Sequence, residues 1–242
     1  VALRRSGLNR EACNYHGVPH FLLWFESNCS RRHMWGALSL LSLNISVNKK
    51  PSATDIRKQL RVMIRAERRS LSPGERALAD KSLIQRLKNF PAFRRAKRIG
   101  IYLAFDGEPE LSRLIAASCS QKFFAPILLN RGLAFSRFNK NSVTKTNRFG
   151  VPEPILRNYA EPDSLDLILT PLVAFNDKGV RLGLGGGHYD RCFGFLETHS
   201  WRSRPILLGI GYEFQRVSSI QAEKWDVRLW GAATELAMRR FS

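Results

Sequence analysis

The chain has 242 residues, of which 44% are apolar and 10% aromatic. This is enough to bury the core of one domain, or of one domain with an extension. Ordinary contents of 17 Gly and 11 Pro exclude collagen-like and low-complexity proteins. No apolar run reaches the roughly 18 residues that would predict a membrane-spanning helix.

The four cysteines, Cys13, Cys29, Cys119 and Cys192, are far apart and form no CxxC pair. This spacing disfavours a zinc site, and so few cysteines in a chain of this size do not indicate a disulfide framework. Reduced thiols are typical of the cytosol, so we expect a cytoplasmic protein.

The net charge of +19 is concentrated in one segment, since residues 51–98 carry 14 basic and 4 acidic side chains. Such a segment has three interpretations: a solvated face, a polyphosphate site or a nucleic-acid patch. A nucleic-acid module would interleave base-stacking aromatics with the basic residues, and residues 54–88 contain no aromatic residue. We therefore expect only weak, salt-sensitive attraction to polyanions, with no specific nucleic-acid partner and no membrane partner.

Residues 1–50 differ from the rest because they lack a clear hydrophobic period. We interpret them as an N-terminal extension that is disordered or that stems from a mis-assigned start. Residues 51–242 are predicted to form a single domain.

The first ordered element is predicted to be a helix that begins at Thr54, whose hydroxyl suits an N-cap. Apolar residues at the spacing i, i+4, i+7 and i+8 predict one buried face, and arginines form a second stripe. The apolar stripe is Ile56, Leu60, Met63 and Ile64, and the basic stripe is Arg57, Arg61, Arg65 and Arg68. A second helix is predicted from the capping box Ser72–Glu75 to about Asn89, burying Leu83, Ile84 and Leu87.

After Pro91 the pattern changes to short apolar runs that are typical of strands. Strands are predicted at 98–103, 123–129, 133–138, 166–175 and 206–210, and helices at 111–118 and 188–198. Pro171 lies inside the fourth of these strands and predicts an edge position or a bulge. The alternation predicts a three-layer α/β/α fold with a largely parallel sheet.

The most informative segment is Arg181–Arg191, which reads RLGLGGGHYDR between a predicted strand and a predicted helix. Its glycines let backbone N–H groups approach an anion, and the helix N-terminus adds a favourable field. Asp190 can hold a divalent ion that bridges phosphates. The Walker A, dinucleotide-binding and G-x-S-x-G motifs are all absent, and His188 stands where the dinucleotide motif needs its third glycine. A glycine-rich turn alone is more often structural, but the added Arg, Tyr and Asp favour phosphate binding.

This segment resembles the RLGxGGGxYDR signature of the 5-formyltetrahydrofolate cyclo-ligases, also called methenyltetrahydrofolate synthetases. Other segments match the family in the same order, over about residues 54–236. They are Ile56–Arg61, Tyr102–Glu108, Phe149–Pro154, Thr170–Phe175, Glu223–Val227 and Thr234–Glu235.

The resemblance implies conversion of 5-formyltetrahydrofolate to 5,10-methenyltetrahydrofolate, with ATP as co-substrate and Mg²⁺ as cofactor. In that reaction the formyl oxygen attacks the γ-phosphate, ADP leaves, N10 closes the ring and phosphate is released. Such chemistry needs positioning and charge neutralisation more than a strong base. We also expect a monomer.

The resemblance assigns roles residue by residue. Arg181 and Asp190 are the expected catalytic residues, and Asp190 and Asp226 the expected magnesium ligands. The expected ATP contacts are Arg57, Lys58, Gln59, Leu60, Arg61, Arg181, Leu182, Gly183, Leu184, Gly185, Gly186, Gly187, His188 and Tyr189. The expected folate contacts are Leu103, Glu108, Leu184, Gly185, Gly186, Gly187 and His188, with Glu108 accepting hydrogen bonds from pterin N–H groups.

Simpler interpretations stay open for some of these residues. Glu108 can cap a helix that starts near Glu110, and Asp226 can be a turn residue. His188 is expected to position the loop rather than transfer protons. Cys192 is expected to be buried and not to act as a nucleophile.

The chain also departs from the family pattern. Arg57 stands where many members have Lys, Asn176 where Asp is usual, and Arg228–Trp230 where Pro-Leu-Asp is usual. These changes keep open a pseudoenzyme that binds folate without turnover.

Overall fold

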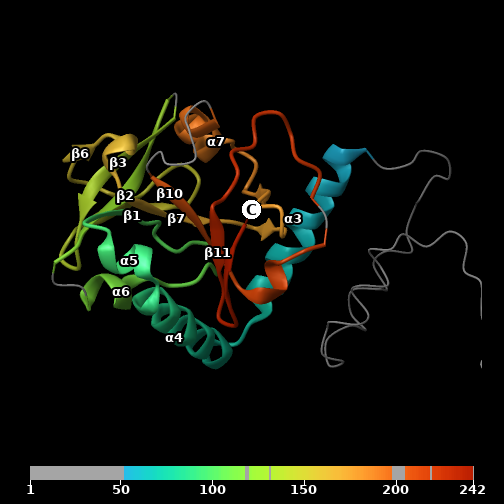
Figure 1. The fold of residues 1–242 in the computed structure, drawn as a ribbon, viewed down its shortest axis with the longest axis horizontal. Helices are drawn as coiled ribbons and strands as arrows, with labels where there is room; N and C mark the ends of the chain where they lie inside the picture. The colour runs from blue at the N-terminus through green and yellow to red at the C-terminus, as the bar shows by residue number, and fades with distance from the viewer. Residues whose placement is uncertain (1–51, 118–119, 131, 198–204, 219, 242) are drawn as a thin grey trace, which may run out of the picture. The chain divides into compact units, whose positions relative to one another are not determined.

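The computed structural model describes residues 52–117, 120–130, 132–197, 205–218 and 220–241. Within them, eight strands form one sheet in the order β12-β11-β10-β7-β1-β2-β3-β6 (Figure 1). The five central strands β11, β10, β7, β1 and β2 run parallel to one another, and the pairs β11–β12, β2–β3 and β3–β6 are antiparallel. The predicted α/β class with a largely parallel sheet is confirmed. Residues 1–50 lie outside the described residues, so their interpretation stays a prediction.

The strands of this sheet are short. They are β1 (Arg98–Gly100), β2 (Lys122–Leu129), β3 (Gly132–Phe138), β6 (Tyr159–Ala160), β7 (Leu167–Pro171), β10 (Ile206–Ile210), β11 (Gly231–Ala233) and β12 (Met238–Arg240). Two further two-stranded sheets pair β4 (Thr144–Thr146) with β5 (Pro152–Pro154) and β8 (Ala174–Phe175) with β9 (Arg181–Leu182).

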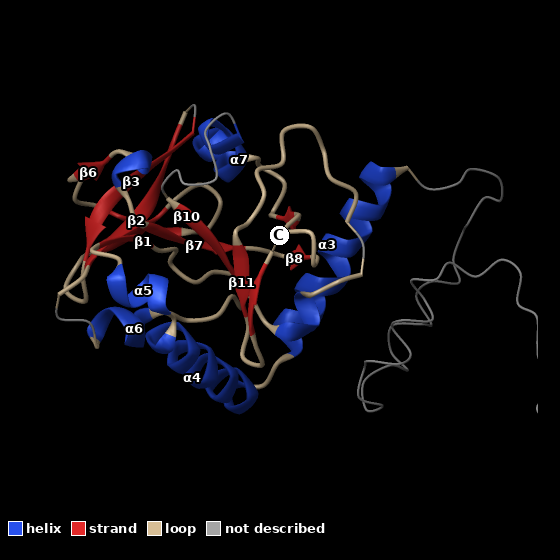
Figure 2. Cartoon of the chain, in the orientation of Figure 1, coloured by secondary structure: helices blue, strands red, loops and turns tan. Residues whose placement is uncertain are grey.

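Helices lie on both faces of the main sheet (Figure 2). They are α3 (Ala53–Ser70), α4 (Pro73–Asn89), α5 (Pro91–Arg95), α6 (Ser112–Ala116) and α7 (His188–Phe193). The apolar residues of α4, α5 and α6 pack into one core cluster, and Phe193 of α7 packs into a second.

The alternation of side chains along the strands produces these two clusters. Phe123 of β2 and Leu167 of β7 face the cluster that contains α4, whereas the next residues, Phe124 and Ile168, face the cluster that contains Phe193. A strand that is buried on both faces has a continuous run of apolar residues, which is the pattern from which these strands were predicted.

Helix α3 begins two residues earlier than expected. Its N-cap is Ser52, so the prediction of a cap at Thr54 was wrong. The Ser52 hydroxyl accepts the Asp55 N–H at 3.2 Å, and the Asp55 carboxylate accepts the Ser52 N–H at 3.1 Å. This reciprocal capping box satisfies two donors, which a threonine at position 54 cannot do here. The second box, at Ser72–Glu75, is confirmed.

Strand β7 occupies the centre of the sheet, between β10 and β1, so the edge position predicted from Pro171 was wrong. Pro171 is the last residue of the strand and lies opposite Ile210 of β10. On the other side, β1 pairs with β7 only as far as Gly100 and Ile168. The proline therefore stands where β7 has a neighbour on one side only, and its missing N–H costs no hydrogen bond to β1.

Strand β1 also ends earlier than predicted, at Gly100 rather than at residue 103. Residues 101–111 continue from it as an irregular segment and reach the site described below. No helix among the described residues is long and apolar enough to cross a membrane.

Candidate functional site

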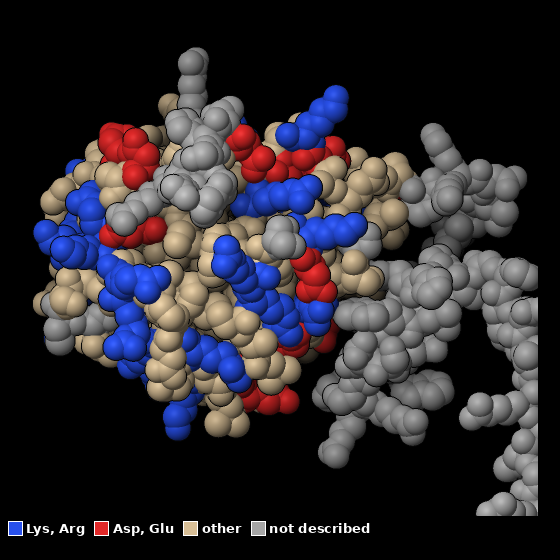
Figure 3. All heavy atoms as spheres, viewed as in Figure 1, with Lys and Arg blue, Asp and Glu red and all other residues tan. Residues whose placement is uncertain are grey.

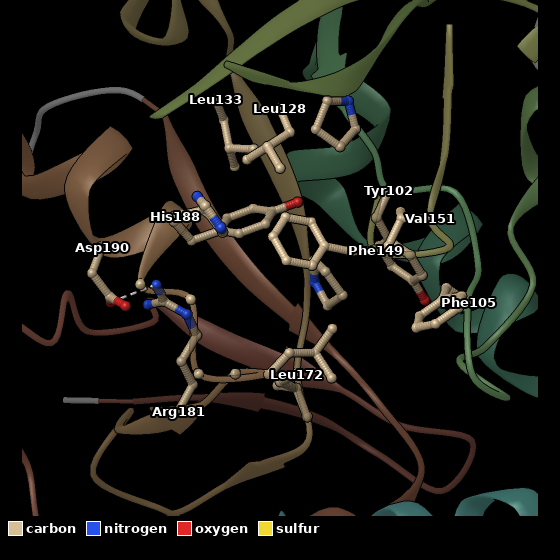
Figure 4. Close-up of a pocket in the computed structure, with 18 of the residues that line it drawn as sticks. Tyr102, Phe105, Leu128, Leu133, Phe149, Val151, Leu172, Arg181, His188 and Asp190 are labelled. Carbon is tan, nitrogen blue, oxygen red and sulfur yellow. Dashed lines mark hydrogen bonds and ion pairs between the residues drawn. The ribbon is translucent and has the colours of Figure 1, made fainter. Parts of the chain in front are cut away.

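A cavity of about 370 Å³ opens at the carboxyl ends of β1, β2 and β7. Parallel sheets commonly bind ligands at this edge. Figure 4 shows a polar side with Arg181, Asp190 and His188, and an apolar side with Tyr102, Phe105, Phe149 and Val151. The cavity therefore has two chemically distinct ends.

The polar end is built on the glycine-rich loop between β9 and α7. Arg181 is 4% exposed and donates to the Asp190 carboxylate at 2.7 Å and to the carbonyl oxygen of Val227. The Val227 N–H donates to the same Asp190 oxygen at 3.2 Å. This triangle ties both ends of the loop to the segment that follows residue 223. Its two predicted catalytic residues, Arg181 and Asp190, are in direct contact.

The loop itself presents backbone donors. Residues Gly183 to Tyr189 all line the cavity. None of the N–H groups of Gly185, Gly186 and Gly187 donates a hydrogen bond to another described residue. Free N–H groups at the wall of a cavity form an anion-binding surface.

Helix α3 brings two arginines to the same end. Arg57 forms a bidentate ion pair with Asp226, at 2.9 and 3.2 Å, and donates to the Gln221 carbonyl at 2.9 Å. Arg61 donates to the Gly183 carbonyl at 2.9 Å. Burial and the neighbouring Arg57 lower the pKa of Arg61, which indicates positive charges held close together.

These contacts bear on the interpretations of the basic stripe. Arg57 and Arg68 have side chains only 12% and 0% exposed, so a solvated face is wrong for them. On the molecular face in Figure 3, other Lys and Arg side chains are interspersed with acidic and uncharged residues. The arginines that point inward toward the glycine loop support the polyphosphate interpretation.

The two aspartates expected to bind magnesium differ in whether a carboxylate oxygen is left without a hydrogen bond. Both carboxylate oxygens of Asp226 are occupied, by Arg57 and by the Glu223 N–H at 3.0 Å. Asp190 uses Oδ1 for both of its contacts, and its Oδ2 accepts no hydrogen bond from a described residue. Across the described ranges, no three His, Cys, Asp or Glu side chains gather as a metal site. Mg²⁺ commonly takes one or two carboxylates and completes its shell with phosphates and water, so Asp190 fits this role and Asp226 serves as the partner of Arg57.

The apolar end contains a buried carboxylate. Glu108 is 7% exposed, and its Oε2 accepts the Phe105 N–H at 3.2 Å. Burial raises the pKa of Glu108 to about 7, and the charge of Arg68 acts in the opposite direction. Leu103 and Tyr102 line the same region. Glu108 is buried within the wall of the cavity. It does not cap α6, which begins at Ser112 with Leu111 as its N-cap and has no side-chain hydrogen bond at that cap.

Glu108 predicts a specific dependence of stability on pH. Its pKa of about 7 lies above the ordinary glutamate value of 4.5, so the folded protein holds a proton that the unfolded chain releases between these values. The resulting stability is fully present below about pH 4.5 and is lost as the pH rises through about 7, on the order of 3 kcal/mol. Glu108→Gln should remove this dependence. Urea unfolding of both proteins from about pH 5 to about pH 8 measures the difference, and a difference that stays constant with pH would contradict the assignment.

Some residues with predicted roles do not line the cavity. Lys58 and Gln59 are exposed on α3, and the side chains of Leu60 and Leu182 are buried in the core. Leu60 and Leu182 can therefore contact a ligand only through their backbone. Leu103, Glu108, Asp190 and Asp226 do line it, together with Arg57, Arg61, Arg181 and the loop 183–189.

Other lining residues received no role from the sequence. Glu153 of β5 is buried, and its carboxylate accepts the Leu128 N–H at 2.8 Å and the Asn147 side-chain N–H at 2.7 Å. Phe149 and Trp225 are 54% and 66% exposed at the cavity. The segment Phe149–Pro154 matched the family pattern, and that match was the signal that pointed here. The remaining unassigned lining residues are Tyr102, Phe105, Pro126, Leu128, Leu133, Asn147, Val151, Pro171 and Leu172.

Three side chains of α7, those of His188, Tyr189 and Cys192, differ in the chemistry that their surroundings allow. The His188 ring contacts the guanidinium of Arg191 at 3.1 Å, and burial with Arg191 and Arg148 lowers the pKa of His188. The Tyr189 hydroxyl is buried at the cavity without a hydrogen-bond partner among the described residues. Burial raises the pKa of Cys192 to about 11, which keeps it a thiol rather than a nucleophilic thiolate.

Of the departures from the family pattern, Arg57 lines the cavity, whereas Asn176 and Arg228–Trp230 lie outside it. Asn176 is buried, and its side-chain oxygen accepts the N–H groups of Lys178 and Val180, both at 3.0 Å. The Arg228 N–H donates to the Glu197 carboxylate at 3.2 Å. Neither Asn176 nor Arg228 is among the residues that line the cavity. Their substitutions therefore affect a turn and a loop contact rather than the site.

Comparisons with known proteins agree with these features. The model of the 5-formyltetrahydrofolate cyclo-ligase family matches residues 53–235. The chain is 36% identical over 185 residues to the 5-formyltetrahydrofolate cyclo-ligase of Haemophilus influenzae, covering 73% of this chain and 96% of the relative. It is 31% identical over 179 residues to the Escherichia coli protein of the same name, covering 71% and 96%.

Solved structures show the same relationship. The 5,10-methenyltetrahydrofolate synthetase of Aquifex aeolicus is similar with a TM-score of 0.67 at 27% identity, covering 76% of this chain and 92% of that one. The synthetase of Mycoplasma pneumoniae shares the fold with a TM-score of 0.58 at 24% identity, covering 74% and 98%. The family signature, the extent of the match and the shared fold together confirm the resemblance, and the chain belongs to the 5-formyltetrahydrofolate cyclo-ligase family.

Proposed function

We propose that this enzyme converts 5-formyltetrahydrofolate to 5,10-methenyltetrahydrofolate and consumes ATP, with release of ADP and phosphate. The observation that carries the proposal is the single cavity with two ends. One end is lined by guanidinium groups and free backbone N–H groups, which suit a triphosphate. The other end is apolar and holds a buried carboxylate, which suits a flat heterocycle with N–H donors.

In this proposal the polar end binds the nucleotide phosphates. Arg57, Arg61 and Arg181 supply positive charge, and the N–H groups of Gly185–Gly187 donate to phosphate oxygens. Asp190 would hold a magnesium ion carried by the nucleotide, and this ion would supply further charge neutralisation. Arg181 fixes Asp190 by its bond to Oδ1, so this carboxylate is oriented before a ligand enters.

The apolar end binds the pterin. Its ring packs among Leu103, Phe149 and Val151, and Glu108 accepts hydrogen bonds from its N–H groups. The unpartnered Tyr189 hydroxyl lies in the wall between Glu108 and Arg181, whose charges both act on it. We assign this hydroxyl as a donor to the oxygen that links the formyl carbon and the γ-phosphate during transfer.

The atoms balance in two steps. The formyl oxygen attacks the γ-phosphorus, and the bond between this phosphorus and ADP breaks. N10 then attacks the formyl carbon and loses its proton, the carbon–oxygen bond breaks, and phosphate leaves with the original formyl oxygen and takes up that proton. Holding both substrates in one cavity converts these encounters into intramolecular steps, which is the main catalytic contribution that the site can supply.

The first experiment measures product formation in purified protein. With 5-formyltetrahydrofolate, ATP and magnesium, we expect the absorbance of methenyltetrahydrofolate to rise and ADP to appear in equal amount. Reactions without ATP, or with a non-hydrolysable ATP analogue, should show no product. Folate binding without turnover in the complete mixture would favour the pseudoenzyme and contradict the proposal.

A second experiment tests the phosphorylated intermediate. Substrate labelled with oxygen-18 in the formyl group should yield inorganic phosphate that carries one labelled oxygen, detected by phosphorus NMR. If the label leaves in water, the formyl oxygen does not attack phosphorus, and the order of bonds proposed above is wrong.

A further inference from the structure

The turn that carries Glu108 has an unusual backbone. Asp106 has φ 53°, and it is the one non-glycine residue with positive φ among the described residues. The next residue, Gly107, has φ 78°, and the Glu108 N–H closes the turn by donating to the Phe105 carbonyl at 3.0 Å. A positive φ at aspartate carries strain, so surrounding contacts must hold this turn in place.

Three arginines from α3 hold it. Arg65 and Arg68 contact the Asp106 carboxylate at 2.6 and 3.0 Å, and Arg69 also contacts it. Arg65 and Arg69 are partly exposed, with side chains 32% and 57% accessible. Arg68 is fully buried, which makes it the only one of the three whose charge is removed from water.

Arg68 connects the turn that carries Glu108 to the segment that follows β7. Its Nε donates to the Asp106 carbonyl at 2.8 Å, and its Nη1 donates to the Leu172 carbonyl at 3.3 Å, just after β7. The same Nη1 lies 3.8 Å from Oε1 of Glu108. Glu108 and Leu172 line the cavity, whereas Arg68 does not.

We propose that Arg68 is a positioning residue for the folate substrate: it fixes the turn Asp106–Glu108 against Leu172 and thereby orients the Glu108 carboxylate toward the cavity. The proposal deepens the proposed function, since it takes Glu108 as the group that accepts the pterin N–H donors. Arg68 acts through Glu108 and does not touch the substrate.

Charged groups face Glu108, so a measurement of its pKa can test the proposed role of Arg68. Arg68 and Arg65 from α3 lower its pKa, and Asp106 in its own turn raises it. The hydroxyl groups of Tyr102 and Tyr189 also interact with its charge. Arg68 is the strongest of the charged neighbours that lower the pKa, so its removal should raise the pKa of Glu108 above its present value of about 7.

The test compares Arg68→Gln with Arg69→Gln. Arg69 contacts the same Asp106 carboxylate but is exposed and makes no described contact with Glu108, so it is a matched control. Carbon-13 NMR titration of the Glu108 carboxyl, in the substrate-free protein, should show a higher pKa in Arg68→Gln and an unchanged one in Arg69→Gln. Steady-state kinetics should show KM for 5-formyltetrahydrofolate raised at least tenfold in Arg68→Gln, with KM for ATP within about twofold, since Arg57 and Arg61 remain in place.

A double substitution separates positioning from general stability. In a Glu108→Gln background, Arg68→Gln should have at most about a threefold further effect on the folate KM, because the group through which it acts is gone. If Arg68→Gln fails to fold, Arg68→Lys keeps the charge but loses the forked contacts to Asp106 and Leu172. Arg68→Lys should still raise the KM for 5-formyltetrahydrofolate. The pKa of Glu108 should change less in Arg68→Lys than in Arg68→Gln, because lysine keeps the positive charge.

The outcomes are distinguishable. Equal increases in both KM values, or a full Arg68 effect in the Glu108→Gln background, would show a merely structural role and overturn the inference. An inactive wild-type protein would contradict the proposed function, yet the NMR titration would still test whether Arg68 controls Glu108. An unchanged Glu108 pKa in Arg68→Gln would overturn the inference whatever the activity of the wild type.

Discussion

Replacing Asp190 by asparagine is expected to lower turnover at least tenfold, which corresponds to about 1.4 kcal/mol or more in the activation barrier. The amide keeps the size of the side chain but removes its charge. Arg181 would then be a buried cation without its counter-charge, and the oxygen that accepts from both Arg181 and the Val227 N–H would be that of a neutral amide, which binds a guanidinium more weakly. The same change removes the carboxylate oxygen that we assign to magnesium.

The measurement is the rate of methenyltetrahydrofolate formation at saturating ATP and folate, repeated over a range of magnesium concentrations. Asp177→Asn is the matched control, because Asp177 also pairs with an arginine, Arg216, but is 59% exposed and lies outside the cavity. We expect that control to stay within about twofold of wild type. Full activity of Asp190→Asn with an unaltered magnesium dependence would remove Asp190 from the site.

The single substitution Gly185→Ala is expected to reduce kcat/KM at least tenfold. Gly185 has φ 109°, a conformation that residues with a Cβ rarely adopt. The cost of strain there is on the order of 1–3 kcal/mol, and the loop can relieve it by turning its N–H groups away from the phosphate site. Space is not the limiting factor, since the nearest atom to an added Cβ is in Arg61 at 3.7 Å.

Gly194→Ala provides the comparison for this prediction. Gly194 follows α7 in ordinary helical conformation, and an added Cβ there meets no atom within 4 Å. We expect Gly194→Ala to keep wild-type kinetics, and calorimetric binding of ATP to both variants should show weaker binding only in Gly185→Ala. Equal ATP affinity in the two variants would mean that the loop conformation does not serve phosphate binding.

Local patterns in the sequence predicted much of the fold. The capping box at Ser72–Glu75 and the buried face of Leu83, Ile84 and Leu87 depend on residues within one helix, so spacing alone identifies them. The errors arose where neighbours in space decide the outcome. Pro171 ends a central strand because β1 has already stopped, and no local pattern around Pro171 contains that information.

The site was predicted in a similarly uneven way. The loop Gly183–Tyr189 is contiguous, so a motif could represent it, and the resemblance supplied Glu108 and Asp226. The pairing of Arg57 with Asp226 joins residues 169 positions apart, and that of Arg68 with Asp106 joins residues 38 apart. Such pairs depend on how α3 packs against the rest of the domain, and no local sequence pattern predicts that packing. The expectations of a monomer and of a cytoplasmic location stay predictions.

The regular geometry of α3 sets the separation between its two groups of arginines. Arg57 and Arg68 are eleven residues apart, so a straight helix places them about 16 Å apart along its axis. Inserting one residue between Arg61 and Arg65 would advance the later group by about 1.5 Å and rotate it by about 100°. The helix would remain, but Arg65, Arg68 and Arg69 could no longer face Asp106 while Arg57 faces Asp226. Natural variation in the length of this segment should therefore be confined to the regions before Ser52 and after Ser70.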